Sequence, residues 1–214
     1  MKRDEIRRRL LRAQPAAPRT TGVGARSDYD LHPLGRSAAP ASRRLKPAGV
    51  LVPLVNRPEG VTILLTQRTA HLQKHAGQIS FPGGGMEPDD PDLQATALRE
   101  TEEEIGLPPD KVEILGALDL YETSTGYGVA PVVGWIEPPI ELAIDPFEVA
   151  EAFEVPLSFV LDPANHARES RTRDGSRRFY YVLQYGRYYI WGATAGMLVN
   201  LSEVLADERR SDRR

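Results

Sequence analysis

The chain has 214 residues, a formal net charge of −3 at pH 7 and no cysteine. The lack of cysteine excludes a thiol nucleophile, a disulfide framework and any cysteine-ligated zinc or iron–sulfur site. The slightly acidic overall charge does not indicate a general nucleic-acid binder, so no nucleic-acid partner is expected. The basic N-terminus lacks the apolar segment of a secretory signal, and no apolar run approaches the ~20 residues that span a bilayer. We therefore expect a cytoplasmic protein without a membrane partner.

Residues 1–47 are expected to form an N-terminal helix and an extended arm at the periphery of the domain. Ile6, Leu10 and Leu11 recur at helical spacing within an Arg-rich stretch, which predicts an amphipathic helix over residues 3–14. Such a helix could bind a membrane surface or phosphate groups, although a solvated helix packed on the domain is the commoner outcome. The rest of the segment is rich in Pro, Ala, Arg and Gly and is expected to be a loop.

The folded domain is expected to span residues 48–206, followed by a polar tail over 207–214. Apolar, β-branched runs at 49–55 and 61–66 are separated by turn residues and predict two paired strands. The same rules predict a helix over 92–105, strands over 112–118 and 129–136, an acidic and partly helical segment over 146–153, a hairpin of 179–185 with 187–189, and a helix over 194–206. Strands that alternate irregularly with helices indicate an α/β or α+β domain with a mixed sheet.

Three glutamates give the predicted helix over 92–105 a chemical function. Glu100, Glu103 and Glu104 are spaced i, i+3 and i+4, so they share one helical face. Clustered carboxylates without matching lysines offer the oxygen ligands that Mg²⁺ prefers when it bridges a protein to substrate phosphates. The glycines of residues 83–85 let the backbone approach a metal or a phosphate closely. A solvated acidic face is the alternative for the glutamates alone, but the glycine loop and Arg99 favour the metal site.

Residues 99–107, Arg-Glu-Thr-Glu-Glu-Glu-Ile-Gly-Leu, resemble the second half of the Nudix family signature. That half reads Arg-Glu-apolar-any-Glu-Glu-any-Gly-apolar, so Thr101 stands where an aliphatic residue is usual. The first half departs from the pattern, because the five-residue spacer after Gly84 ends at an aspartate, Asp90, and one residue more than usual then precedes the arginine. Counted from Gly85 the spacing is regular, but Pro91 then stands at the glutamate position, so the loop has either a one-residue insertion or a shifted register. In the family this acid braces the arginine, a role that we expect of Asp90 or Glu87 here.

The resemblance implies a Nudix fold, which is a mixed β-sheet between α-helices with the signature as a loop–helix–loop. It also implies hydrolysis of a nucleoside diphosphate linked to another moiety, with Mg²⁺ or Mn²⁺ as the cofactor. By this resemblance Glu100 and Glu104 are metal ligands, and Glu103 is a ligand or holds a metal-bound water. The carbonyl oxygen of Gly83 is expected to complete the protein ligands, and Arg99 belongs to the catalytic set.

The general base is left open by the resemblance. It is either a glutamate of the signature acting through water or a carboxylate from a later segment. Glu148 and Glu151 are the later candidates, and ordinary surface acids on a short helix are an equally good interpretation of both.

The segment upstream of the signature resembles the extended motif of coenzyme A pyrophosphatases within the Nudix family. It contains Leu64-Leu65-Thr66, then Gly77 and Phe81-Pro82-Gly83-Gly84, with Lys74 where an arginine is usual. Lysine keeps the charge of arginine but not its bidentate phosphate geometry. Coenzyme A carries a 3′-phosphate besides its pyrophosphate, so its site needs additional cations. The residues expected to bind the substrate are Arg68, Lys74, His75 and Gly84, with His71 either joining them or merely covering the loop.

The expected reaction cleaves coenzyme A into 3′,5′-ADP and 4′-phosphopantetheine. Acyl or oxidised coenzyme A are expected substrates too, because the thiol end lies far from the bond that is cut. Two alternatives stay open: a Nudix pyrophosphatase acting on ADP-ribose, dinucleoside polyphosphates or capped RNA, and a non-catalytic Nudix-fold ligand sensor. The C-terminal residues 189–196 also resemble the coenzyme A subfamily, with Trp191 either near the site or in the core. A monomer and a homodimer are both compatible with the sequence.

Overall fold

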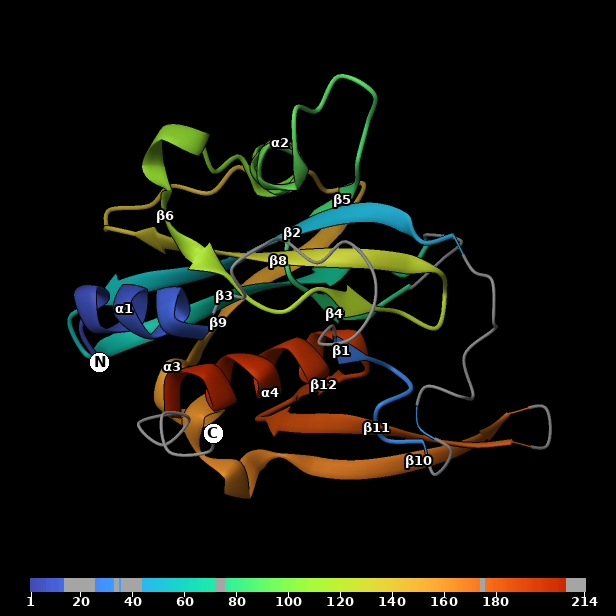
Figure 1. Cartoon of the computed structure of the whole chain (residues 1–214). Coiled ribbons are helices and arrows are strands. Elements are labelled where there is room, and N and C mark those ends of the chain that lie inside the picture. Colours follow the sequence, from blue (N-terminus) through green and yellow to red (C-terminus); the bar gives the residue numbers. More distant parts are fainter. Residues whose placement is uncertain (14–25, 33–34, 36–43, 72–75, 174–175, 207–214) are drawn as a thin grey trace.

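A computed structural model describes residues 1–13, 26–32, 35, 44–71, 76–173 and 176–206 (Figure 1). Their helices are α1 (Arg3–Ala13), α2 (Leu93–Ile105), α3 (Leu157–Leu161) and α4 (Ala193–Ala206), with 3₁₀ turns η2 (Pro109–Lys111) and η3 (Pro163–Asn165). Within these ranges no helix is long and apolar enough to cross a membrane.

The described strands form one nine-stranded sheet and one three-stranded sheet. The larger sheet contains β1 (Arg26–Ser27), β2 (Lys46–Arg57), β3 (Gly60–Arg68), β4 (Ile79–Ser80), β5 (Gly83–Gly85), β6 (Glu113–Ala117), β7 (Tyr121–Glu122), β8 (Tyr127–Ile136) and β9 (Val149–Pro156). The smaller sheet contains β10 (Ala167–Arg173), β11 (Ser176–Tyr185) and β12 (Tyr188–Trp191).

Strands β2 and β8 run parallel at the centre of the larger sheet, whose order is β1-β7-β8-β2-β3-β4. Strands β5, β6 and β9 pair with β2, β8 and β3 respectively. The β1–β7 pair is also parallel, and the other pairs are antiparallel. The predicted mixed sheet is therefore confirmed, and so is the expected placement of a sheet between helices.

The side chains of β2 alternate between two cores, one on each face of the larger sheet. Leu51 and Val55 belong to the core that α2 covers. Val52 and Leu54 belong to the core that α1, α3 and α4 cover. Figure 1 shows α2 on one side of the sheet and α3 and α4 on the other.

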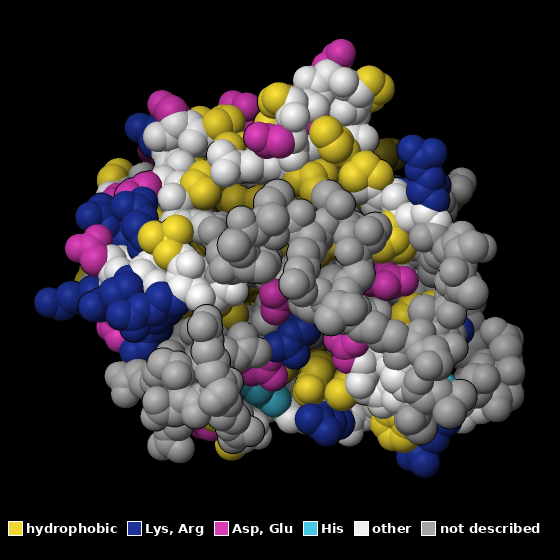
Figure 2. Space-filling view, in the orientation of Figure 1, with side chains coloured by type: hydrophobic (Ala, Val, Ile, Leu, Met, Phe, Trp, Pro, Cys, Tyr) yellow, Lys and Arg dark blue, Asp and Glu magenta, His cyan; other side chains and the backbone are white. Residues whose placement is uncertain are grey.

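Helix α1, predicted over residues 3–14, is packed on the domain. Ile6 and Leu10 are fully buried in the same core as α4, whereas Leu11 is 58% exposed. The apolar stripe of the helix is therefore used inside the protein, in the core of the domain that was expected to begin at residue 48. Its outer side carries a group of Lys and Arg side chains, visible at the left of Figure 2.

One predicted segment is wrong. Residues 146–153 were expected to be partly helical, but β9 begins at Val149 and pairs along β3, with Leu64 opposite Glu154 and Leu65 opposite Phe153. Helix-forming Glu and Ala residues in this segment pointed locally to a helix. The long-range ladder with β3 provides the backbone hydrogen bonds instead, and it overrides that weak local preference.

The C-terminal hairpin and last helix are confirmed as β11, β12 and α4. The hairpin turns at Gly186, whose φ of 54° is in the left-handed region. Strand β10 and helix α3 were not predicted. The sequence of β10 has no alternation of apolar and polar residues, and it is a strand because Ala167 to Arg173 pair with β11 from Val182 back to Ser176.

Candidate active site

Helix α2 is fixed at both ends by side-chain and backbone chemistry. The Asp92 side chain accepts a hydrogen bond from the N–H of Ala95, which caps the N-terminus. Gly106 ends the helix with a φ of 66° and donates its N–H to the carbonyl of Glu102. The predicted helix boundaries are therefore confirmed, and the three glutamates of interest lie in its last two turns.

Gly49 allows α2 to lie directly on β2. A Cβ atom at this position would stand 2.1 Å from the carbonyl oxygen of Leu93 and 3.0 Å from the nitrogen of Ala97. The close approach turns the inner face of α2 toward the glycine loop of residues 83–85. Sequence reasoning did not assign Gly49 a role, although a glycine inside a β-branched run is a known sign of close backbone approach.

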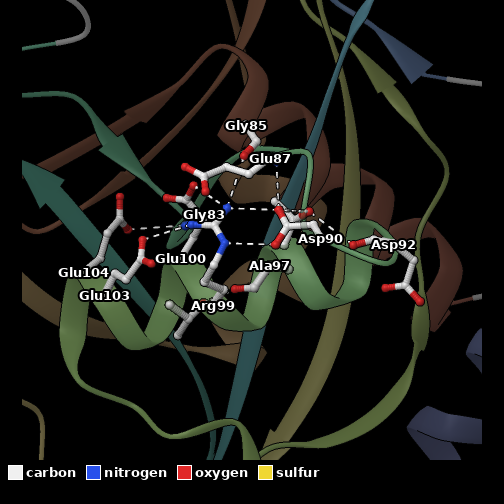
Figure 3. Close-up of polar contacts among 12 residues, drawn as sticks. Gly83, Gly85, Glu87, Asp90, Asp92, Ala97, Arg99, Glu100, Glu103 and Glu104 are labelled. Atoms are coloured by element: carbon white, nitrogen blue, oxygen red, sulfur yellow. Dashed lines mark hydrogen bonds and ion pairs between the residues drawn. The ribbon is translucent and has the colours of Figure 1, made fainter.

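The carboxylates of Glu104 and Glu100 lie on the inner face of α2, beside the glycine loop (Figure 3). The side chain of Glu104 is 4% exposed and that of Glu100 is 19% exposed. The N–H of Gly83 donates to Glu104 Oε2 at 3.3 Å. A Cβ atom on Gly84 would stand 2.4 Å from the Glu100 carboxylate carbon, so the loop passes against this carboxylate with no room for a side chain.

Glu103 lies at the rim of the site, with 60% of its side chain exposed. It accepts a hydrogen bond from Arg99 Nη1 at 3.0 Å, as a pair four residues apart on α2. The helical spacing that grouped the three glutamates is confirmed, but their environments differ: Glu104 is buried, Glu100 is partly buried and Glu103 faces solvent.

Arg99 is braced by Asp90. Its Nε donates to Asp90 Oδ1 at 3.0 Å and its Nη2 to Asp90 Oδ2 at 3.0 Å, a bidentate pair. The Asp90 carboxylate also accepts from the hydroxyl of Thr96 and the N–H of Glu87, both at 2.9 Å. Of the two acids considered from the sequence, Asp90 is thus the partner of Arg99. The turn in which Asp90 and Glu87 hydrogen-bond each other accommodates the additional residue of the loop.

The Asp90–Arg99 pair orients the guanidinium toward the rest of the site. Arg99 Nη2 also donates to Glu100 Oε1 at 3.1 Å and to the carbonyl of Gly85 at 3.3 Å. Hydrogen bonds from Arg99 are the main reason that the pKa of Asp90 is lowered well below its usual range. Arg99 therefore links the helix to Gly85 at the end of the glycine loop and to Asp90.

Burial raises the pKa of Glu104 to about 7, against the lowering effects of the Gly83 N–H and of Arg68. Burial also raises the pKa of Glu100, against the lowering effect of Arg99. The negative charge of Glu148 raises the pKa of both groups further. These carboxylates are close enough to oppose each other's ionisation, which a cation between them would relieve.

The donor set suits a hard divalent cation. Among the described side chains no three carboxylates or imidazoles already converge on one point, because Glu100 and Glu103 are turned to Arg99 while Glu104 is turned to Gly83. The groups that could hold a cation are nevertheless carboxylate oxygens, next to a backbone that carries no side chain. This chemistry fits Mg²⁺ or Mn²⁺ and does not fit a soft metal.

Arg68 and Glu148 lie beside the α2 carboxylates. Arg68 is the last residue of β3, and Glu148 directly precedes β9. Arg68 Nη1 stands 3.4 Å from Glu104 Oε1, and Arg68 Nη2 stands 3.8 Å from Glu148 Oε2. The backbone carbonyl of Glu148 accepts from the N–H of Thr69 at 3.0 Å, which fixes its position beside β3. The structure thus brings together Arg68, Glu148 and the α2 carboxylates.

Glu151, the other late candidate for a general base, lies in a different environment. It accepts from Arg187 Nη2 at 2.5 Å and from the hydroxyl of Tyr188 at 2.7 Å. Its neighbour two residues on, Phe153, stacks on the Tyr188 ring in the core that α4 covers. Because alternate residues of a strand share a face, Glu151 is directed to the face of the sheet opposite α2.

Some predicted site residues are placed elsewhere or cannot be placed. Lys74 and His75 lie outside the described residues. His71 lies against Phe147, with ring centroids 4.9 Å apart. Trp191 lies on β12, where its ring meets the edge of Tyr180 at 5.3 Å. Thr96, which hydrogen-bonds the bracing aspartate, was not singled out, because a threonine within a helix has no distinctive sequence signal.

Comparison with known proteins agrees with this geometry. The NUDIX domain family model matches residues 45–173. A protein of Escherichia coli O7:K1 named "Uncharacterized Nudix hydrolase NudL" is 42% identical over 155 residues, which are 72% of this chain and 80% of that protein. A protein of the same name from Photorhabdus laumondii subsp. laumondii is 43% identical over 156 residues, 73% of this chain and 83% of that one.

Two solved structures are also similar to this chain. The Nudix hydrolase RenU from M. smegmatis covers 78% of this chain and 91% of its own at 18% identity, with a TM-score of 0.49. A C. elegans Ap4A hydrolase binary complex covers 52% of this chain and 80% of its own at 20% identity, with a TM-score of 0.45. The family model matches more than half of the chain, and relatives above 40% identity align with 72% or more of it. The chain therefore belongs to the Nudix hydrolase family.

Proposed function

We propose that this Nudix hydrolase cleaves the pyrophosphate bond of coenzyme A and its acyl or oxidised forms. The supporting observation is that the parts of the coenzyme A-type motif adjoin the carboxylate site. Strand β3 carries Leu64-Leu65-Thr66 and pairs with β4, with Thr66 opposite Ser80. The Phe81-Pro82-Gly83-Gly84 run follows directly and reaches Glu104 through the N–H of Gly83.

Glu100 and Glu104 are the residues proposed to hold Mg²⁺ or Mn²⁺, with Glu103 and the carbonyl of Gly83 as further oxygen donors. A divalent cation at this position neutralises charge on the pyrophosphate and lowers the pKa of a bound water. Burial raises the pKa of both Glu100 and Glu104, so cation binding would also stabilise their charged forms. Arg99, braced by Asp90, keeps Glu100 in place next to the loop.

Glu148 is proposed as the general base. In the hydrolysis, the oxygen of a water bonds to one phosphorus atom while the bridging P–O bond breaks. The water proton moves to the Glu148 carboxylate, and the departing phosphate takes the electrons of the broken bond as a phosphate oxygen. Glu148 is a better candidate than Glu151 because it stands 3.8 Å from Arg68 at the carboxylate site, whereas Glu151 is held by Arg187 and Tyr188.

Arg68, Lys74 and His75 are proposed to bind the phosphates of coenzyme A, including its 3′-phosphate. Arg68 stands at the inner edge of the site, 24% exposed, and its guanidinium is planar and always charged. The roles of Lys74 and His75 rest on the sequence motif. Gly84 is proposed to contact the pyrophosphate through its backbone, a role that rests on the sequence motif, while its lack of a side chain leaves room for the Glu100 carboxylate.

The test is to incubate the full chain with Mg²⁺ and coenzyme A and to identify the products by chromatography and mass. We expect 3′,5′-ADP and 4′-phosphopantetheine in equal amounts. Glu104→Gln should lower the rate at least about 100-fold, by analogy with loss of other charge-stabilising groups in active sites. The matched control is Glu102→Gln, which removes an exposed charge from the same helix and should keep nearly full activity.

ADP-ribose and a dinucleoside polyphosphate are assayed in parallel. Rapid turnover of either one without turnover of coenzyme A would refute the proposed substrate and leave the pyrophosphohydrolase assignment intact. A folded protein that turns over none of these compounds, but binds one of them, would point instead to a ligand sensor.

A further inference from the structure

The smaller sheet is a local concentration of positive charge and aromatic rings. Residues 167–191 contain six arginines and two acidic residues, although the chain as a whole has a formal net charge of −3. The same stretch holds seven of the fifteen Phe, Tyr and Trp residues of the chain. The expectation of no nucleic-acid partner was based on the overall charge, which conceals this uneven distribution.

The two faces of the smaller sheet are chemically different. One face carries Leu183 and Ile190, which are fully buried in the core with α4. The register of β10, β11 and β12 puts the alternate residues on the opposite face. This second face, here called the outer face, carries Glu169, Arg171, Arg178, Tyr180, Gln184, Tyr189 and Trp191, together with Val182, which lies opposite Trp191 and is 2% exposed.

Side chains of the outer face form a connected layer. The Arg171 guanidinium lies over the Trp191 ring at 5.9 Å from its centroid, and the Tyr180 and Trp191 rings pack edge-to-face with centroids 5.3 Å apart. The Tyr189 hydroxyl donates to the Glu169 carboxylate at 2.8 Å, and 39% of Tyr189 is exposed. Guanidinium planes and ring faces are thus presented together.

Arginines also lie next to aromatic rings on the opposite face, the one that carries Leu183 and Ile190. These pairs lie toward the end of the β10–β11 hairpin that projects past α4 in Figure 1. The Arg177 guanidinium lies 5.0 Å from the Phe179 ring centroid, and that of Arg168 lies 5.4 Å from the Tyr181 ring centroid. This part of the hairpin therefore repeats the pairing of an arginine with a ring.

The arginines of β10 and β11 whose side chains are described do not form ion pairs. Arg168, Arg171, Arg177 and Arg178 are exposed, and none has an acidic partner within ion-pair distance among the described residues. By contrast, Arg57 pairs with Glu154 at 2.6 Å and Arg99 pairs with Asp90 at 3.0 Å. Two of these four unpaired guanidinium groups, Arg171 and Arg178, lie on the outer face, where they can contact an anion from outside the chain.

We propose that the outer face of the smaller sheet binds single-stranded nucleic acid. Exposed guanidinium groups bind backbone phosphates, and aromatic rings beside them stack on unpaired bases. A lipid headgroup or an acidic peptide offers negative charge but no flat base for the rings. A duplex offers phosphates, but its bases are stacked inside. The combination of unpaired arginines with rings therefore favours a strand whose bases are free. The proposal is independent of which pyrophosphate the active site cleaves.

The test is fluorescence anisotropy of the full chain with a labelled single-stranded oligonucleotide of about 12 nucleotides, a length that one such surface can accommodate. We expect saturable binding of RNA or DNA strands at low salt and weaker binding of the matching duplex. If about three phosphates are contacted, raising salt from about 50 to about 200 mM should weaken binding roughly twentyfold.

Variants separate this surface from general electrostatics. The double variant Arg171→Ala with Arg178→Ala should weaken binding at least about tenfold at low salt, because two phosphate contacts are lost. The matched control is Arg8→Ala with Arg12→Ala, which removes the same charge from two exposed arginines of α1 and should change binding by less than about twofold. Tyr189→Ala should weaken binding roughly fivefold through lost stacking, and Tyr189→Phe should restore it.

Three results would overturn the proposal. The first is absence of binding by the wild-type chain at low salt. The second is equal weakening by the α1 and hairpin double variants, which would reduce the effect to total charge. The third is binding to vesicles of anionic phosphatidylglycerol without binding to oligonucleotides. Circular dichroism melts of each variant verify that a loss of binding is not a loss of fold.

Discussion

At the scale of single residues, Asp90 fixes the orientation of the Arg99 guanidinium. Both of its carboxylate oxygens bind the guanidinium, and Thr96 and the N–H of Glu87 hold the carboxylate from the other side. An aspartate thereby serves where the Nudix signature has a glutamate, because the turn that contains it brings the shorter side chain close enough. The brace determines where Arg99 can reach Glu100 and Glu103.

The contribution of Asp90 to stability is expected to depend on pH. Its pKa in the folded protein is lowered by Arg99, so its stabilising effect is fully present above the unfolded value of about 4. The effect is lost as pH falls through the lower folded value. The difference in melting temperature between wild type and Asp90→Asn should therefore be largest at neutral pH and narrow below about pH 4. Asp89→Asn, an exposed neighbour, is the control, and a difference that widens in acid would contradict this account.

The general base can be identified by comparing two glutamates of the same segment. Glu148→Gln should lower kcat by roughly 100-fold or more, the range expected for loss of a general base. Glu151→Gln should leave kcat within about threefold, because its partners Arg187 and Tyr188 lie away from the carboxylate site. Steady-state kinetics with saturating Mg²⁺ measure both. Equal losses in the two variants would show that Glu148 has no special role.

At the scale of elements, the packing of α2 on β2 sets the position of the carboxylates. Gly49→Ala places a Cβ atom against the Leu93 carbonyl at 2.1 Å, so the helix must shift. We expect a loss of roughly 1–3 kcal/mol in the free energy of unfolding together with reduced activity. Gly85→Ala meets no atom within 4 Å and should change stability by less than about 1 kcal/mol. Denaturant titrations measure both, and equal stability of the two variants would mean that the contact is not tight.

Two neighbouring leucines of helix α1 can be compared to test whether the helix belongs to the core. Leu10 is fully buried and Leu11 is 58% exposed, although they are neighbours with the same side chain. Leu10→Ala should reduce the free energy of unfolding by roughly 2–5 kcal/mol, whereas Leu11→Ala should change it by less than about 0.5 kcal/mol. Thermal or denaturant unfolding decides the matter. A small effect of Leu10→Ala would mean that α1 is not part of the cooperative fold.

At the scale of the whole molecule, the larger sheet separates the two regions for which we propose functions. The α2 side carries the carboxylates, the glycine loop and Arg68. The other side carries α4 and, beyond it, the smaller sheet (Figure 1), whose arginines at 168, 171, 177 and 178 are exposed. The arrangement explains why Glu148 and Glu151, three residues apart, have different partners. It also allows the smaller sheet to bind a partner without covering the carboxylates.

Local sequence signals predicted the elements that depend on local chemistry. The apolar spacing predicted a helix over 92–105, and α2 is as expected; the cap at Asp92 and the end at Gly106, which were not singled out, follow short-range rules as well. What local reasoning missed depends on distant partners. β9 is a strand because of β3, and β10 is a strand because of β11.

The candidate site was also predictable from the sequence only where it depends on a contiguous motif. The glutamates and the loop follow from a contiguous motif, so the sequence places them together. The choice between Asp90 and Glu87 could not be made from spacing, because it depends on how the turn between them folds. The separation of Glu148 from Glu151 depends on the register of β9 with β3, which includes an irregularity at Gln67 and Arg68.

The most direct test of the proposed activity compares kcat/KM for coenzyme A with that for dephospho-coenzyme A under identical Mg²⁺ concentrations. The two substrates differ only in the 3′-phosphate, for which Arg68, Lys74 and His75 are the proposed cations. We predict a preference for coenzyme A of about tenfold or more, equivalent to about 1.4 kcal/mol of lost binding in the transition state. Equal kcat/KM values, or a preference for dephospho-coenzyme A, would contradict the assignment of this site to coenzyme A.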